Sequence, residues 1–177
     1  CGGGGGRRPP RSVCGALDQC RALVLRRPSM AISWLHLAHL ERESGNLDAG
    51  IDALKHGGAL APDDVIAVSL LGGYLGEAAR AREAAAWLEP VARQDDADPQ
   101  VLVAYALALA KLGRHDEAVA TFDRAVAADP LNARLLVERG TAHMMAGRSG
   151  RARADFEAAI ASNPAAARAH TSLGVLA

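Results

Sequence analysis

The residues best suited to bind a metal ion are two histidines and a glutamate in one short stretch. His36, His39 and Glu43 are spaced i, i+3 and i+7, which places them near one face if the stretch is helical. Imidazole nitrogens with a carboxylate suit a transition metal. Two solvated histidines explain the same spacing, however, and no third strong ligand is fixed beside them, so we predict no metal site.

No other motif predicts catalysis or cofactor binding. The sequence contains no P-loop, no GxGxxG after a strand, no HExxH and no GxSxG. The three cysteines, Cys1, Cys14 and Cys20, form neither a CxxC pair nor an even set, so neither a zinc site nor a disulfide framework is expected. We therefore predict a protein that is not an enzyme, with no catalytic residue and no cofactor.

The composition favours helices over sheets. Half of the 177 residues are apolar and only 3% are aromatic, and alanine supplies much of the apolar share. Small side chains let helices approach closely, whereas a β-sandwich would be richer in branched and aromatic residues. We expect an all-α protein with no membrane span and no signal peptide, which leaves its localisation open between the cytoplasm and a bacterial envelope.

The charges balance overall but are unevenly distributed. The net charge is zero, yet it is +5 over residues 1–30, −8 over residues 31–130 and +3 over residues 131–177. A protein that binds nucleic acid would show a sustained basic face, because neutralised phosphates supply most of its affinity. The acidic middle of the chain therefore predicts that nucleic acid is not a partner.

Two stretches of the chain repeat one another 34 residues apart. Residues 113–130 read GRHDEAVATFDRAVAADP, and residues 147–164 read GRSGRARADFEAAIASNP. Prolines mark the same period, with Asp96 at the missing position: Pro28, Pro62, Pro130 and Pro164. The expected turn position recurs between them, at Gly45, Ala79, Gly113 and Gly147, and a glycine there can end a helix in the left-handed conformation. Each period therefore predicts two helices joined by a tight turn and closed by a proline.

Small and large side chains recur in phase with this period. Small residues are predicted where helices cross: Ala38, Gly72, Ala106, Gly140 and Gly174 on the first helix of each period, and Ala16, Gly50, Ala84, Ala118 and Ala152 on the second. Larger residues are predicted to be buried: Trp34, Val68, Leu102 and Leu136 on first helices, and Cys20, Leu54, Leu88, Phe122 and Phe156 on second helices.

A 34-residue helix–turn–helix period with these residues resembles the tetratricopeptide repeat. Trp34, Leu37 and Ala38 match the start of the family's motif, and Gly50, Leu54 and Pro62 match its end, with glycine where alanine is usual. The closest agreement is in two later sets: Ala118, Phe122, Ala125 and Pro130, then Gly140, Ala152, Phe156, Ala159 and Pro164. The resemblance covers about residues 14–177 and implies a tetratricopeptide-repeat α-solenoid, a right-handed superhelix of antiparallel helix pairs.

The predicted array has four full repeats and two partial ones. The full repeats are 31–64, 65–98, 99–132 and 133–166; the partial ones are 14–28 and 167–177. Pro90 is predicted to kink the second helix of its repeat, and Asp98 is predicted to cap the helix that Pro99 begins. Residues 1–13, rich in glycine, arginine and proline, are predicted to be a disordered tail.

The resemblance implies a function as well as a fold. In this family the first helices line a concave groove that holds a peptide or a partner helix. The groove positions here are Leu35, His36, His39, Arg42, Glu43, Ser69, Gly73, Glu77, Gln100, Val103, Leu107, Lys111, Arg134, Val137, Glu138, Thr141 and Met145. One subgroup clamps the carboxylate of chaperone tails with lysine and asparagine. This chain lacks both at the matching positions, so that ligand is not expected.

Three functions remain open. The first is a non-catalytic scaffold for a protein or peptide partner. The second is the repeat region of a larger bacterial enzyme, because residues 87–148 look like repeats appended to sulfatase-like hydrolases and, less closely, to glycosyltransferases. The third is a structural element that self-associates through residues 167–177, where Leu173, Gly174 and Leu176 would pack against a second helix that the chain does not supply.

Overall fold

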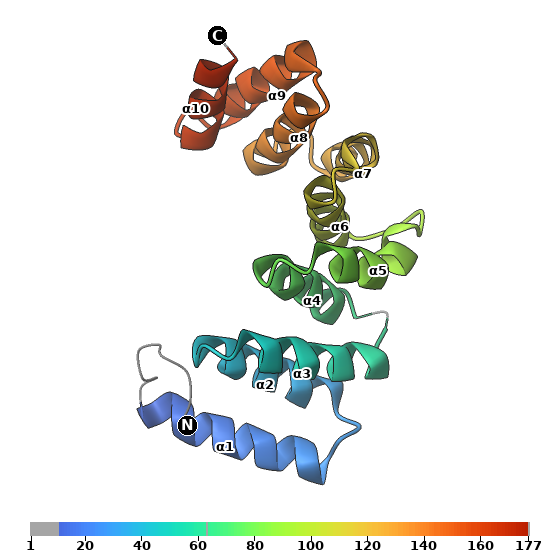
Figure 1. Ribbon diagram of the computed structural model, residues 1–177, viewed down its shortest axis with the longest axis vertical. Helices are drawn as coiled ribbons and strands as arrows, with labels where there is room; N and C mark the ends of the chain where they lie inside the picture. Colours follow the sequence, from blue (N-terminus) through green and yellow to red (C-terminus); the bar gives the residue numbers. More distant parts are fainter. Residues whose placement is uncertain (1–10, 63, 177) are drawn as a thin grey trace. The chain divides into compact units, whose positions relative to one another are not determined.

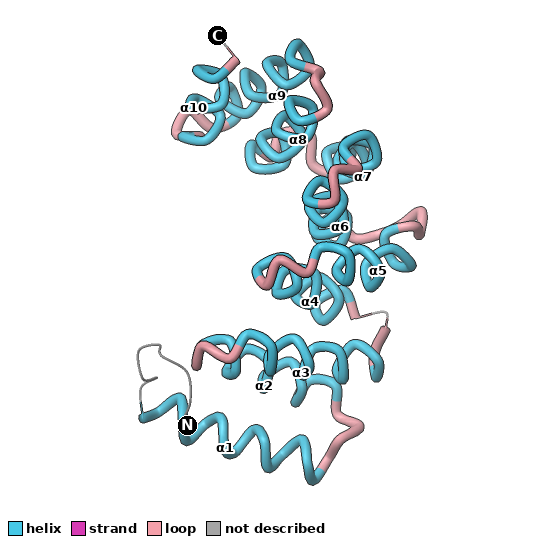
Figure 2. Tube along the Cα trace, in the orientation of Figure 1, coloured by secondary structure: helices cyan, strands magenta, loops and turns pink. Residues whose placement is uncertain are grey.

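The computed structural model describes residues 11–62 and 64–176, and over these residues it contains ten helices and no strand (Figures 1 and 2). This confirms the all-α prediction. Residues 1–10 of the tail predicted to be disordered lie outside the described part, and α1 (Arg11–Arg26) begins at its last three residues. The handedness of the superhelix that the resemblance implies stays a prediction.

The helices form two compact units that divide between Arg80 and Ala81. The N-terminal unit contains α1, α2 (Ala31–Glu43), α3 (Leu47–Leu60) and α4 (Val65–Glu77). The C-terminal unit contains α5 (Ala81–Ala92), α6 (Pro99–Lys111), α7 (His115–Ala128), α8 (Ala133–Met145), α9 (Ser149–Ser162) and α10 (Ala167–Val175). Within each unit every helix packs on the next one along the chain. The division falls inside the predicted repeat 65–98.

Four turns of one kind end the first helices, as predicted. Gly45, Gly113 and Gly147 have φ between +72° and +87°, and Ala79 has φ +58°. At Gly113 the amide donates to Ala110 O, and the next amide, of Arg114, donates to Leu109 O, both at 3.0 Å. The same pair of bonds closes the other three turns and satisfies carbonyls that the helix leaves unpaired. Ala79 has a Cβ in this conformation, so its turn is the strained one.

Polar side chains cap the starts of three first helices. Asp98 accepts from the amide of Gln100 at 2.7 Å, which confirms the predicted cap. Asp64 and Asn132 stand at the same position of the neighbouring periods, and each accepts from two amides of its helix. Such caps satisfy amides that have no partner inside the helix. The caps and turns together set where α4, α6 and α8 begin and end.

The predicted core positions are largely buried. Phe122, Phe156, Leu54 and Leu88 are fully enclosed, as are most of the small residues at the helix crossings. At one crossing the fit is tight, because a Cβ on Gly140 would lie 2.7 Å from the ring of Phe156. Large side chains there would force the helices apart. The prediction is wrong at Gly174, which is exposed on α10 with no atom within 4 Å of its Cβ position, because no helix crosses it.

Trp34 and Cys20 are only half-buried, contrary to the prediction of full burial. The indole of Trp34 donates to the carbonyl of Pro28 at 2.8 Å and stacks on the ring of His56, with centroids 4.7 Å apart. Trp34 lies on α2 beside the connection from α1, where the packing is open on one side. An indole needs a partner for its N–H, and this position supplies one at the edge of the core.

The helix that contains Pro90 is shorter than its counterparts. The second helix of the period has 14 residues in α3, α7 and α9 but 12 in α5, which ends two residues after Pro90. Arg124 of α7 donates to the carbonyls of Ala92 and Gln94, both at 2.5 Å. A guanidinium at this end satisfies free carbonyls and opposes the negative end of the helix dipole. The predicted kink at Pro90 stays a prediction.

Candidate peptide-binding surface

The predicted groove residues lie on one stripe along each first helix. On α8 they are Arg134, Val137, Glu138, Thr141 and Met145, and all but Val137 are spaced by four, three and four residues. In a helix with 3.6 residues per turn, this spacing keeps side chains on the same side. We call the stripes of α2 and α4 the N-terminal face, and those of α6, α8 and α10 the C-terminal face.

An ion pair joins the two helices of the N-terminal face. Arg42 of α2 donates from Nε to Oε2 of Glu77 on α4 at 2.9 Å, although these residues are 35 apart in sequence. The guanidinium also lies 5.1 Å from the centroid of the Tyr74 ring. The bond to Glu77 raises the pKa of Arg42, and burial raises the pKa of Tyr74. The structure thus brings together two residues that sequence reasoning had assigned to one surface.

The histidines of α2 lie on the exposed side of the helix. His39 Nε2 lies 3.3 Å from Oε1 of Glu43, and both side chains are exposed, as is His36. Across residues 11–62 and 64–176, no group of three or more histidine, cysteine, aspartate or glutamate side chains could hold a metal ion. The face presents these groups to solvent, where they can donate and accept hydrogen bonds.

Other predicted residues of the N-terminal face vary in exposure. Leu35 is buried and packs in the core rather than on the surface. Gly73 is exposed, and Ser69 is half-buried with its hydroxyl donating to Ile66 O at 3.2 Å. Sequence reasoning did not include Ile32 or Ile66, which are 34 residues apart and both largely exposed at the starts of α2 and α4. Because they occupy the same position of successive 34-residue periods, the repeat pattern could have identified them.

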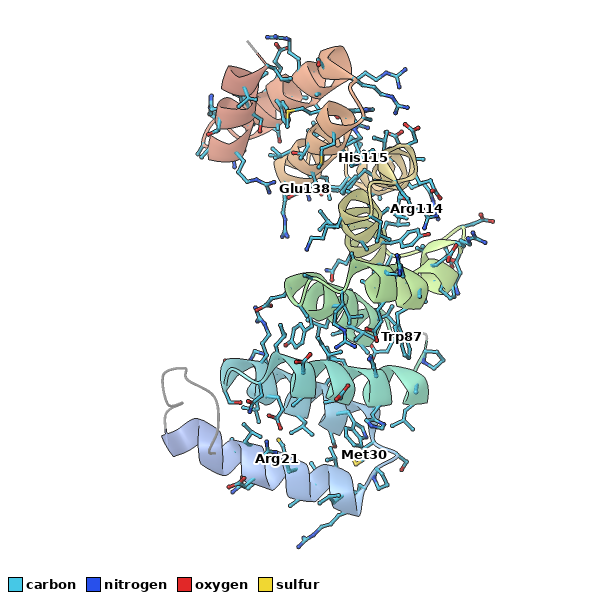
Figure 3. All side chains as sticks on the ribbon, viewed as in Figure 1. Arg21, Met30, Trp87, Arg114, His115 and Glu138 are labelled. Atoms are coloured by element: carbon cyan, nitrogen blue, oxygen red, sulfur yellow. The ribbon has the colours of Figure 1, made fainter. Side chains whose placement is uncertain are left out.

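A second ion pair joins the helices of the C-terminal face. Arg168 of α10 donates from its terminal nitrogen to Oε1 of Glu138 on α8 at 2.5 Å. Figure 3 shows Glu138 on α8, and its side chain is only 12% exposed. Sequence reasoning missed Arg168, although it stands 34 residues after Arg134 and so at the same position of the next period. The pair extends the C-terminal face from α8 onto α10.

The rest of the C-terminal face is mixed. Met145 is 54% exposed and Val175 is 73% exposed at the ends of their helices. The remaining predicted residues on this face are as follows: Gln100, Lys111 and Arg134 are exposed, Val103, Leu107 and Thr141 are half-buried, and Val137 is buried. The face therefore offers both polar and apolar side chains, the combination that a peptide with both kinds of side chain requires.

A largely buried charged cluster joins α8 of the C-terminal face to α7 and α9. Arg139 of α8 binds both oxygens of Asp155 on α9, at 3.0 and 2.5 Å, and one oxygen of Asp123 on α7 at 2.9 Å. His143 lies beside it, with Nε2 4.0 Å from Asp155 and Nδ1 buried without a hydrogen-bond partner. Burial lowers the pKa of His143. The bidentate bond ties three helices together. Sequence reasoning did not find it, because Arg139 and Asp155 lie on different helices of one period, 16 residues apart, and Asp123 belongs to the preceding period.

A smaller polar cluster joins α2 of the N-terminal face to α1. Glu41 of α2 is buried and accepts from Nε of Arg21 on α1 at 2.9 Å. Figure 3 labels Arg21 on α1. Its second oxygen accepts from the side-chain amide of Asn46 at 3.2 Å. Both oxygens of a buried carboxylate are thereby satisfied. The cluster fixes α1 against α2 on the side away from α4.

Comparisons with known proteins agree on the kind of repeat. Two family models of the tetratricopeptide repeat match the sequence, over residues 99–142 and over residues 137–177. No curated protein matches the sequence at a significant level. In the described part of the chain, no helix is both long and apolar enough to cross a membrane.

Solved structures share the fold at low sequence identity. One is YrrB, described as a TPR protein with an unusual peptide-binding site, with 16% identity, a TM-score of 0.78, and coverage of 92% of this chain and 84% of that chain. A structure of MamA has 18% identity, a TM-score of 0.76 and coverage of 88% and 91%. MamA residues 41 to the end, from Desulfovibrio magneticus RS-1, have 16% identity, a TM-score of 0.76 and 87% coverage of both chains.

At these identities the likeness concerns the fold, while the family models concern the sequence of the second half of the chain. The period, the four turns and the helix order agree with both. Residues 99–177 therefore carry the sequence of tetratricopeptide repeats, and the described chain has the helical-repeat fold of tetratricopeptide-repeat proteins.

Proposed function

We propose that this protein is a non-catalytic scaffold whose first-helix faces hold a peptide or a partner helix. The fold itself is that of protein-interaction scaffolds. The observation that most supports a site on the first helices is the pair of ion bridges, Arg42 with Glu77 and Glu138 with Arg168. Each bridge joins the stripes of two successive first helices, α2 with α4 and α8 with α10, which favours a ligand that contacts both.

The exposed side chains on these faces suit a ligand that is partly apolar. On the N-terminal face Ile32, Ile66 and Leu70 are exposed near the starts of the helices, and the polar bridge lies at their ends. On the C-terminal face Met145 and Val175 are exposed. Contact with apolar ligand side chains would remove this area from water, which is favourable by about 25 cal/mol per Å².

Nothing in the comparisons supports the alternative that these are repeats of a sulfatase-like hydrolase or a glycosyltransferase, because the matches concern repeat sequence and repeat fold. Self-association through residues 167–177 stays a prediction. Leu173 and Leu176 on this segment are half-buried, and Arg153 of α9 donates to the Leu176 carbonyl at 2.9 Å. These contacts attach α10 to the preceding helix.

The proposal can be tested with one substitution on the face and one away from it. Peptides would be selected from a displayed random library with the full chain, and their affinity measured by fluorescence anisotropy. Met145→Glu should weaken binding of peptides seated on the C-terminal face by about tenfold, because a carboxylate there would have to be desolvated. Leu131→Glu is the matched control, since Leu131 is also exposed but lies in the loop before α8.

Two results would count against the proposal. If no peptide were selected, the proposal that the first-helix faces bind a peptide would be contradicted. An equal loss of affinity in Met145→Glu and Leu131→Glu would place binding elsewhere or show that both variants unfold. Circular dichroism of both variants separates those two explanations, because an unfolded variant would lose its helical signal.

A further inference from the structure

The first helices of the C-terminal unit carry an excess of positive charge. In α6, α8 and α10 the only acidic residue is Glu138. The basic residues of the same three helices are Lys111, Arg134, Arg139 and Arg168. A ligand on this face therefore meets more basic than acidic side chains, which favours acidic groups.

Two of these basic side chains already form ion pairs within the fold. Arg139 is held by Asp155 and Asp123 behind the face, and Arg168 is bound to Glu138. Arg134 is exposed in the first turn of α8, and no carboxylate of the described residues pairs with it. It is therefore the guanidinium on this face that a ligand can bind without breaking an existing ion pair.

The N-terminal face offers no equivalent. Its two helices contain one arginine, Arg42, which Glu77 neutralises while the guanidinium lies over Tyr74. Glu43 lies beside His39 at the same end of the face. Taken separately, the two faces therefore differ in charge, and an acidic group suits the C-terminal face.

The helix geometry sets a spacing for such a ligand. Arg134 and Met145 are eleven residues apart on α8, which is about 16 Å along the helix axis at 1.5 Å per residue. An extended peptide covers about 3.3 Å per residue, so about five residues bridge this distance. Thr141 lies between the two, and its hydroxyl donates to Val137 O at 2.8 Å, which leaves its oxygen able to accept from a peptide amide.

Building on the proposed scaffold function, we propose that the C-terminal face binds an extended acidic–apolar segment of a partner protein. An aspartate or glutamate of the segment pairs with Arg134, and an apolar side chain about five residues away packs on Met145. Planar, bidentate binding of a carboxylate is the interaction for which a guanidinium is best suited. The segment would lie along α8, across Thr141.

The test uses a displayed random peptide library selected against the full chain and against two variants. Arg134→Gln removes the guanidinium charge that is proposed to bind the acidic residue of the peptide. Arg151→Gln is the matched control, because Arg151 is likewise an exposed arginine without a described ion pair, but it lies on α9 and outside the face. Peptides enriched by the wild-type chain would then be synthesised with a fluorescent label for measurement of their affinity.

The expected result is enrichment of peptides with an acidic and an apolar residue about five positions apart. Arg134→Gln should weaken their binding about tenfold at low salt, Arg151→Gln should leave it unchanged, and salt should reduce the difference between the two. Enrichment without acidic bias, or equal loss in both variants, would overturn this inference while the scaffold function stands. Failure to enrich any peptide would overturn both.

Discussion

Glu41 and His143 occupy the same position in the period, three repeats apart, one in each unit. In the two intervening repeats the position holds Leu75 and Leu109, and all four side chains are buried. The repeat therefore accommodates three chemically different side chains, glutamate, leucine and histidine, in one kind of buried site. What differs between the two polar members is how completely their hydrogen-bonding groups are satisfied.

In the N-terminal unit the buried polar group is fully bonded. Glu41 receives Arg21 on one oxygen and Asn46 on the other, and Arg21 remains 44% exposed. In the C-terminal unit Arg139 takes both oxygens of the neighbouring Asp155, and His143 is left with a buried Nδ1 that bonds to nothing described. A repeat thus tolerates a polar residue in its core where adjacent helices supply partners, and it is weakened where they do not.

The largest effect on the free energy of unfolding is expected at a core position that is fully buried in both units. Phe156 of α9 and Leu54 of α3 stand at the same position of the period, and both are fully buried. Phe156→Ala should lower the free energy of unfolding by about 3–5 kcal/mol and Leu54→Ala by about 2–5 kcal/mol. Urea denaturation followed by circular dichroism measures both. Glu157→Ala, an exposed neighbour on α9, should change it by less than about 0.5 kcal/mol.

The second-largest effect on stability distinguishes the Asp155 cluster from the Glu41 cluster. Asp155→Ala should cost about 3 kcal/mol, because Arg139 is only 20% exposed and would lose a bidentate partner inside the fold. Glu41→Ala should cost about 1 kcal/mol, since Arg21 can return to water. The same denaturation experiment measures both variants. Equal losses would show that the clusters contribute alike and that the difference in exposure is irrelevant.

The incomplete bonding of His143 predicts a dependence on pH. Burial lowers its pKa, and the nearby Arg139 and Arg148 act in the same direction against Asp155 and Asp123. The unfolded chain therefore takes up the proton first, so stability is full above about pH 6.5 and falls as pH falls toward the lowered pKa.

The expected loss is at most about 1.4 kcal/mol per pH unit. His143→Leu, which restores the residue type of Leu75 and Leu109, should flatten the dependence relative to the wild-type chain. Urea midpoints at several pH values for both chains isolate the contribution of this histidine, because the two chains are otherwise identical. Parallel curves would mean that His143 does not titrate differently on folding.

The smallest effect concerns two turns of the same geometry. Ala79 has φ +58° where Gly113 has φ +77°, and the amide of Ala79 makes a longer bond, 3.3 Å against 3.0 Å. Ala79→Gly should stabilise the N-terminal unit by about 0.5–1 kcal/mol, and Gly113→Ala should destabilise the C-terminal unit by about 1 kcal/mol. Thermal unfolding of both variants checks the opposite signs. A loss of stability in Ala79→Gly would show that chain entropy outweighs strain.

Much of the fold could be predicted because it depends on residues close together in the chain. The left-handed turns at Gly45 and Gly113, the Asp98 cap and the burial of Phe122 and Phe156 each follow from local sequence repeated in phase. Local backbone preferences act over a few residues, and the 34-residue period places them correctly. The prediction failed at Gly174, where the period requires a neighbouring helix that the described chain does not contain.

The candidate surface was predictable only as a set of positions. The period assigned Arg42, Glu77 and Glu138 to first-helix stripes, but it also assigned Leu35 and Val137, which the structure buries. Position in a repeat gives the approximate direction in which a side chain leaves its helix. Whether that direction leads to solvent or to a neighbouring helix depends on how closely the helices pack.

By itself, the sequence determined the helices, their turns and caps, the order of the repeats and the apolar core. Only the tertiary structure decided the ion pairs of Arg42 with Glu77, 35 residues apart, and of Glu138 with Arg168, 30 residues apart. It also decided that Arg134 is left without a carboxylate. The reason is that an ion pair forms only when two charged groups approach within about 4 Å, and that distance is set by helix packing rather than by either residue's own neighbours in the chain.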